Sequence, residues 1–118
     1  FVMILDALQL RLLEKIRSDL AGYSVVRSTS PLDNRAIWLE IFADGIHKGN
    51  SCQTLLKKLN INCKEVAGLG NDYNDIDFLD ICAEAYLVAN APVNLQRHYK
   101  LVKSDKEEGF TEFISKVL

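Results

Sequence analysis

The first part of the chain carries two hydrophobic patterns, one with the period of a helix and one with the period of a strand. Leu12, Leu13, Ile16 and Leu20 fall on one helical face, and Gly22 is placed to end that helix. Apolar and polar residues alternate along residues 36–42, which is typical of a half-buried strand. The elements expected here are a strand at 1–5, a helix at 7–21, and strands at 23–28 and 36–42 that pair as an antiparallel hairpin.

Beyond residue 43 the pattern changes to strands that alternate with helices. Short apolar runs bounded by polar residues predict buried strands, and apolar residues at helical spacing predict the segments between them. The elements expected here are helices at 48–59, 75–82, 92–98 and 110–117, and strands at 66–69, 85–89 and 101–102. Such alternation predicts an α/β fold with a parallel sheet and helices on both faces. We therefore expect two parts, residues 1–43 and residues 44–118.

Composition and charge narrow the classes of partner. The 118 residues are 48% hydrophobic and 25% charged, as in ordinary globular domains, and the formal net charge is −2. The basic residues are scattered, so we expect no nucleic-acid partner. No apolar run approaches bilayer-spanning length, so we expect no membrane partner. The chain opens inside an apolar run at Phe1, which favours a start within a longer polypeptide.

The cysteines bear on the cellular compartment. Cys52, Cys63 and Cys82 are an odd number at unrelated spacings, which fits neither a disulfide framework nor a zinc site. We interpret them as small buried residues in a reducing environment, and we expect a cytoplasmic protein.

The segment Gly68–Asp75 is the most informative for chemistry. It follows a predicted buried strand and precedes a helix, at the end of a parallel sheet where ligands bind. Asn71, Asp72, Asn74 and Asp75 concentrate hard oxygen donors there, which suit magnesium. A polar loop that only caps the following helix has the same composition, so both interpretations stay open.

Lys48 is a second candidate, because it lies at the predicted start of a helix just after the change of pattern. Its ammonium could offset carboxylates and hold a phosphate as a compact point charge. A solvent-facing lysine is the alternative.

Five ordered segments resemble the haloacid dehalogenase (HAD) phosphatases of the Cof-like branch. They are Leu39-Glu40-Ile41, Gly45–Gly49, Gly70–Asp75, Val88–Pro92 and Glu107–Phe110. The resemblance covers roughly residues 36–118 and implies that residues 44–118 are the C-terminal part of a HAD-like Rossmannoid core. Residues 1–43 would then be the last strand, helix and hairpin of an α/β cap domain.

The resemblance also implies site roles and a cofactor. Lys48 would contact the phosphoryl group, Asn74 would help to position it, and Asp75 would orient Lys48 or the metal. Mg²⁺ would be held by Asn71, Asp72 and Asp75. Asn71 departs from the family's usual aspartate, and either Asn71 or the neighbouring Asp72 could take the ligand role.

The family's nucleophile, in an Asp-x-Asp-Gly-Thr segment, has no counterpart in the chain. Asp6 ends an apolar run, but Ala7-Leu8-Gln9 supplies no second acid to protonate a leaving group. We interpret Asp6 as a residue at the start of a helix in the cap domain. We expect this chain alone to be inactive.

The implied parent enzyme is a Mg-dependent phosphatase that hydrolyses small phosphomonoesters through an aspartyl-phosphate. Its substrate would be a sugar phosphate or similar phosphorylated metabolite. Arg27, Arg35 and Asn90 are candidate substrate contacts. The missing N-terminal half, or another protomer, would complete the sheet. The alternatives are an inactive fragment, a phosphate- or metal-binding α/β module, or a receiver-type signalling domain.

Overall fold

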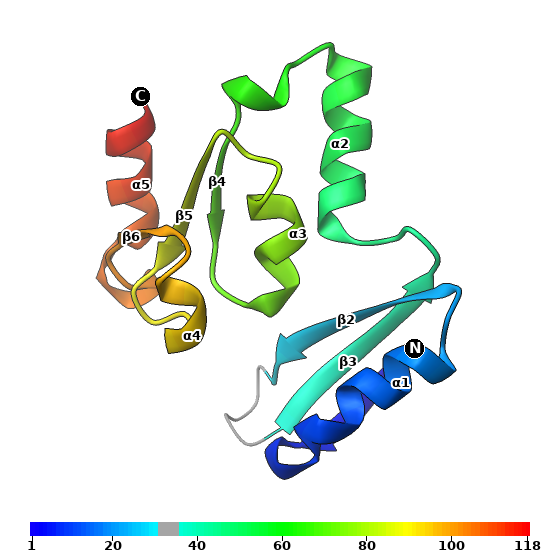
Figure 1. Ribbon diagram of the computed structural model, residues 1–118. Helices are drawn as coiled ribbons and strands as arrows, with labels where there is room; N and C mark the ends of the chain where they lie inside the picture. Colours follow the sequence, from blue (N-terminus) through cyan, green and yellow to red (C-terminus); the bar gives the residue numbers. More distant parts are fainter. Residues whose placement is uncertain (31–35) are drawn as a thin grey trace. The chain divides into compact units, whose positions relative to one another are not determined.

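The computed structural model describes residues 1–30 and 36–118, which fold into two compact units (Figure 1). The first unit comprises residues 1–47 and the second residues 48–118. The second contains a parallel sheet with helices, so the expected α/β class is confirmed. That the first unit is the remnant of a cap stays a prediction. Within the described residues, no helix combines the length and the apolar character needed to cross a membrane.

The first unit is built on a three-stranded antiparallel sheet. β1 (Val2–Asp6), β2 (Tyr23–Thr29) and β3 (Ala36–Ala43) lie in the order β1-β3-β2. The predicted pairing of the two later strands is confirmed, with Arg27 beside Leu39. Their connection at residues 31–35, including Arg35, lies outside the described residues.

The helical segment of this unit differs from its prediction. Residues 7–21 were expected to form one helix, but they give a 3-10 helix (Ala7–Leu12) followed by α1 (Leu13–Asp19). A 3-10 helix has three residues per turn, so it rotates the apolar stripe out of register. Leu12 is consequently 36% exposed, whereas Leu13 is buried. The small core of the unit consists of Leu5, Leu13, Ile37 and Leu39.

Asp6 begins this helical segment as a cap. Its carboxylate accepts the backbone N–H of Leu8 at 2.8 Å, and the Gln9 side chain accepts the N–H of Asp6 at 3.0 Å. This reciprocal arrangement satisfies two N–H groups that a helix start leaves without partners. The interpretation of Asp6 as a helix-start residue is therefore confirmed.

The second unit has a parallel sheet in the order β4-β5-β6. Its strands are β4 (Ala67–Gly70), β5 (Glu84–Val88) and β6 (Lys100–Val102), and its helices are α2 (Lys48–Leu59), α3 (Ile76–Leu79), α4 (Val93–Gln96) and α5 (Gly109–Val117). Figure 1 shows α5 on one side of this sheet and α2 and α3 on the other. Short 3-10 turns at Cys63–Glu65, Tyr73–Asp75 and Asp105–Glu107 complete the unit.

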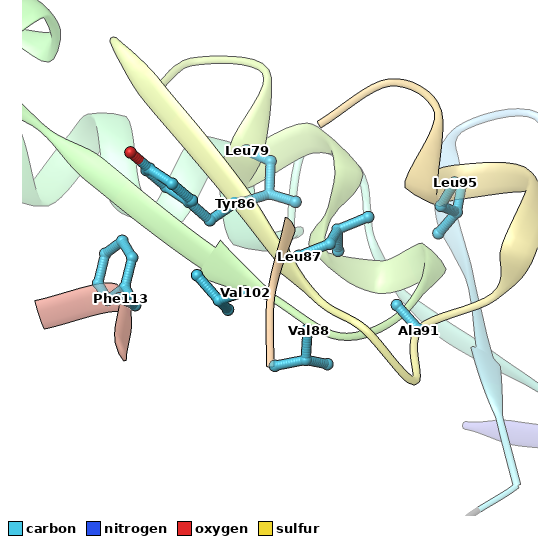
Figure 2. Packing of buried hydrophobic residues seen from close by; sticks show 8 residues of the cluster. All are labelled: Leu79, Tyr86, Leu87, Val88, Ala91, Leu95, Val102 and Phe113. Carbon is cyan, nitrogen blue, oxygen red and sulfur yellow. The ribbon is translucent and has the colours of Figure 1, made fainter. Parts of the chain in front are cut away.

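The core of the second unit surrounds the central strand, β5 (Figure 2). Tyr86, Leu87 and Val88 are consecutive and all buried, as expected of a strand covered on both faces. The Tyr86 ring meets the edge of Phe113 from α5, with ring centroids 5.4 Å apart. This packing fixes the carboxyl end of β5 and, with it, the loops that carry the polar residues.

Two expectations about this unit are wrong. The helix predicted at 75–82 is shorter, because residues 73–75 form a 3-10 turn and α3 ends at Leu79. The cysteines are not all buried: Cys63 is exposed, and Cys52 and Cys82 are partly buried. Burial raises the pKa of the Cys82 thiol to about 11, with smaller contributions from Cys52 and Cys63.

Candidate active site

The polar loop at residues 71–75, called here the site loop, leaves the carboxyl end of β4. Gly70, the last residue of β4, is buried where the loop folds back over it. A Cβ on Gly70 would lie 2.8 Å from Asp75 Cβ and 2.9 Å from Leu79 Cδ1. Only glycine therefore allows the loop to fold this closely onto the strand, which brings Asp75 to the strand end.

Asp75 is the centre of the site loop's hydrogen bonding. Its Oδ2 accepts the backbone N–H groups of Asn71 at 2.8 Å and Asp72 at 3.2 Å. Its Oδ1 accepts from Lys48 Nζ at 2.5 Å. Asp75 is only 5% exposed, so these partners replace the water that a buried carboxylate needs. The loop and the lysine are thus tied together through one carboxylate.

Lys48 is the first residue of α2, and its ammonium also donates to Asn74 Oδ1 at 3.3 Å. The next residue, Gly49, is buried, and a Cβ there would lie 2.5 Å from the backbone oxygen of Asp77. The start of α2 therefore packs directly on the backbone that follows the site loop. This contact places Lys48 beside Asp75, across 27 positions of sequence.

A cavity of about 560 Å³ lies at these strand ends. It is lined by Lys48, Leu69, Gly70, Asn71, Asp75, Val88, Asp105, Glu108 and Phe110. An ammonium, a carboxamide and three carboxylates thus share one cavity with apolar side chains of the sheet. Such a mixture suits a ligand with an anionic group, a cation and a less polar or hydroxylated remainder.

The other predicted site residues have different surroundings. Asp72 is buried, and its carboxylate caps the following turn by accepting the N–H of Tyr73 at 2.7 Å. Asn90 is exposed and bonded to Asp105. Arg27 lies on β2 in the first unit, half-buried. Lys48, Asn74 and Asp75 are therefore the predicted residues that the structure brings together, with Asn71 on the same cavity.

Two lining residues, Asp105 and Glu108, were not predicted as site residues. Both follow β6, the third parallel strand, so their position after a strand end was the available signal. The segment Glu107–Phe110 contributed only to the family resemblance. Nothing in its residue pattern places these carboxylates in a cavity with Lys48.

The donor set bears on whether a magnesium ion fits. Within residues 1–30 and 36–118, no group of three or more His, Cys, Asp and Glu side chains could hold a metal ion. Asn71 and Asp75, however, both line the cavity, and their side chains carry an amide oxygen and a carboxylate. Mg²⁺ commonly takes only one or two protein carboxylates and keeps several waters. The oxygen donors therefore fit magnesium as part of a ligand set.

Residues 4–114 match the family model of haloacid dehalogenase-like hydrolases. Among curated proteins, the chain is similar to "Putative phosphatase M6_Spy0533" of Streptococcus pyogenes serotype M6. The two are 27% identical over 95 residues, which cover 80% of this chain and 33% of that protein. The chain therefore spans about a third of that relative's length.

Solved structures give the same result for the fold. SMU.1108c from Streptococcus mutans UA159 matches with a TM-score of 0.78 and 26% identity, over 98% of this chain and 44% of that one. The HAD subclass IIB sugar phosphatase BT4131 matches with a TM-score of 0.75 and 13% identity, over 98% of this chain and 42% of that one. The receiver-type alternative is excluded by these matches. Because the family model spans nearly all of its sequence, this chain belongs to the haloacid dehalogenase-like hydrolases.

Proposed function

We propose that this chain is part of a magnesium-dependent phosphatase that hydrolyses small phosphomonoesters, with sugar phosphates as the substrate class. The observation that carries the proposal is the Lys48–Asp75 ion pair on the wall of a cavity at the strand ends. The names of the curated relative and of the sugar phosphatase among the structural relatives support the same reaction class.

Lys48 is the group proposed to hold the phosphoryl oxygens. Its side chain is 52% exposed and lines the cavity, while Asp75 and Asn74 fix its ammonium. A positive charge held in place before the reaction stabilises charge that develops on phosphoryl oxygens without reorganising. In this proposal Asp75 orients the lysine and the loop, and Asn74 positions the ammonium.

Magnesium is proposed as the cofactor, held by Asn71 and Asp75. When bound, it supplies charge neutralisation of the phosphoryl oxygens. Either Asn71 or Asp72 could take the role of the family's usual metal-binding aspartate. Asn71 is favoured because it lines the cavity, whereas Asp72 is buried and caps the following turn. The neutral amide of Asn71 should bind the ion more weakly than a carboxylate would.

The nucleophilic aspartate is proposed to come from polypeptide beyond these residues. Asp6 is engaged as a helix cap. In the described sheet β4 pairs with β5 on one side only. We propose that the missing N-terminal half, or another protomer, supplies a strand on the other side of β4. A cytoplasmic location, expected from the cysteines, and contacts of Arg27 and Arg35 with the substrate, expected from the family resemblance, are part of the same proposal.

Replacement of Lys48 tests the proposal. The full-length protein containing this chain should hydrolyse p-nitrophenyl phosphate in the presence of Mg²⁺. Lys48→Ala should lower kcat by roughly 10²–10³-fold, the usual effect of removing one positioned donor to a transition-state oxyanion. Lys58→Ala is the matched control, because Lys58 is exposed in the last turn of the same helix. Unchanged kinetics of Lys48→Ala would reject the proposed role.

A further inference from the structure

The loops that follow β5 and β6 are joined by two hydrogen bonds between one pair of residues. Asn90 Nδ2 donates to Asp105 Oδ1 at 2.8 Å, and the backbone N–H of Asp105 donates to Asn90 Oδ1 at 3.2 Å. The carboxamide thus binds the side chain and the backbone of the same residue. We call this pair the clasp. Because Asp105 lines the cavity, the clasp connects an exposed asparagine to the cavity wall.

The β6 side of the clasp is a tightly folded segment, residues 103–109. The N–H groups of Glu107 and Gly109 both donate to the Ser104 carbonyl at 3.0 Å. A Cβ on Gly109 would lie 2.1 Å from the Lys103 carbonyl oxygen. Glu108 has φ 64° and ψ 36°, which lie in the left-handed region of backbone conformation that residues other than glycine rarely adopt. These internal bonds hold the backbone of the segment, whereas the Asp105 carboxylate is bonded to Asn90 in the loop after β5.

The β5 side of the clasp is held independently. Gln96 Nε2, from the end of α4, donates to the carbonyls of Ala89 at 3.0 Å and Ala91 at 2.8 Å. These two residues flank Asn90 in sequence. Asn90 is therefore a fixed point, and residues 103–109 are the segment that it positions.

We propose that Asn90 is a positioning residue that sets substrate specificity, because the clasp keeps the Asp105–Glu108 wall of the cavity in place. This inference rests on the proposed phosphatase function. Carboxylates repel phosphoryl oxygens and accept hydrogen bonds from hydroxyl groups. The wall therefore suits a hydroxylated leaving group, while Lys48 serves the phosphoryl group. Loss of the clasp should weaken the binding of hydroxylated substrates and leave phosphoryl transfer largely intact.

Three variants of the full-length protein separate the clasp from the charge of Asp105. Asn90→Asp replaces the donor by a second carboxylate and breaks the Nδ2 bond. Asp105→Asn removes the charge but leaves an oxygen that can accept from Asn90. The double variant Asn90→Asp/Asp105→Asn restores the lost side-chain bond with donor and acceptor exchanged, because the new amide donates to the new carboxylate. The backbone N–H of position 105 still donates to the side chain at position 90, as in the wild type.

The expected result is a change in KM that depends on the substrate. For a sugar phosphate, Asn90→Asp should raise KM about tenfold with kcat within about threefold of wild type. For p-nitrophenyl phosphate, whose leaving group has no other hydroxyl, both constants should change less than about threefold. For the sugar phosphate, Asp105→Asn should raise KM by less than Asn90→Asp does, because it loses one carboxylate of the wall but keeps the clasp, and the double variant should match Asp105→Asn. On p-nitrophenyl phosphate both should resemble wild type. Asn62→Asp, which adds the same charge at an exposed turn outside the cavity, is the control.

Other outcomes overturn the inference. A merely structural clasp would lower the active fraction, so apparent kcat would fall equally on both substrates while KM stayed constant. Wild-type KM in Asn90→Asp, or a double variant as impaired as Asn90→Asp, would also exclude the positioning role. Absence of wild-type turnover on either substrate would reject the proposed function itself, and that result is distinguishable from failure of the inference alone.

Discussion

At the scale of single residues, the site depends on glycines that allow close backbone contacts as well as on its polar side chains. Gly49 and Gly70 leave room where backbone from one element touches another. Asp75, 5% exposed, receives hydrogen bonds on both oxygens and so holds the site loop and Lys48 at once. A larger residue at either glycine should lower the proposed activity only by displacing Lys48 and Asp75, because it leaves their chemical groups unchanged.

Gly49→Ala tests this dependence. The added Cβ would lie 2.5 Å from the Asp77 carbonyl oxygen and 2.9 Å from its carbon, both backbone atoms that cannot rotate away. We expect about 1–3 kcal/mol of destabilisation, the usual cost of overpacking, in chemical denaturation of the isolated chain. The full-length enzyme should lose activity because Lys48 moves. Ser51→Ala, exposed on the same helix, should do neither. Wild-type stability of Gly49→Ala would contradict this packing.

How far the sequence predicts the site differs from residue to residue. Lys48 and Asp75 could be expected to meet, because a helix start and a strand end carried complementary charges. Asp105 and Glu108 could not be placed, because their position depends on the path of a short segment with a left-handed residue. No periodicity in the sequence encodes such a path. Asp72 could not be told from Asn71 as a cavity residue, because both types favour loops and caps alike.

At the scale of elements, the ends of neighbouring strands are fixed by side-chain pairs as well as by the sheet. At the start of β5, Glu84 Oε2 accepts from Tyr86 Oη at 2.8 Å and from Lys100 Nζ of β6 at 2.9 Å. The hydrogen bond from Lys100, followed by that from Tyr86, lowers the pKa of Glu84 below its ordinary value of 4.5. The same bond raises the pKa of Lys100 above 10.5.

These directions predict how stability depends on pH. Because the folded-state pKa of Glu84 is lowered, the pair stabilises the fold above pH 4.5, and this contribution is lost as pH falls through the folded-state pKa. Glu84→Gln should therefore lower the thermal midpoint slightly at neutral pH, and this difference should shrink as pH is lowered below 4.5. A double-mutant cycle with Lys100→Met measures the coupling. A coupling that persists at the lower pH would contradict this assignment.

The elements themselves were predicted better than their lengths. The helix at 48–59 and the alternation of strands with helices after residue 43 followed from hydrophobic spacing. The apolar spacing of residues 48–59 places Leu55 and Leu59 on one stripe of α2, and these two side chains are 54% and 56% exposed. The neighbouring α3 has four residues against twelve in α2, so it cannot cover that stripe. Sequence spacing identifies an apolar face but does not reveal the length of its neighbour.

At the scale of the whole molecule, the candidate site is only part of what the proposed reaction needs. Lys48, Asn71 and Asp75 lie in one unit, and the proposed nucleophile does not. The curated relative is about three times as long as the matched segment, which covers 33% of it.

Phosphatase activity should therefore differ between residues 1–118 alone and the full-length protein. With Mg²⁺ and p-nitrophenyl phosphate, residues 1–118 alone should show no turnover, whereas the full-length protein should be active. EDTA should abolish the activity of the full-length protein, and excess Mg²⁺ should restore it. Activity of the isolated chain that is lost in Asp6→Asn would contradict the helix-cap role of Asp6. Activity of the parent that is insensitive to EDTA would reject magnesium as cofactor.

The shortness of β4 limits how the rest of such an enzyme could be attached. Its four residues, Ala-Gly-Leu-Gly, offer few backbone groups and little side-chain surface to an added strand. An intermolecular complex through this strand would gain little free energy, so physical linkage in one polypeptide, with its high effective concentration, is the favourable way to keep the nucleophile at the cavity. If the protein is cut between the two halves, activity should then fall and become dependent on protein concentration, because the halves would have to associate again.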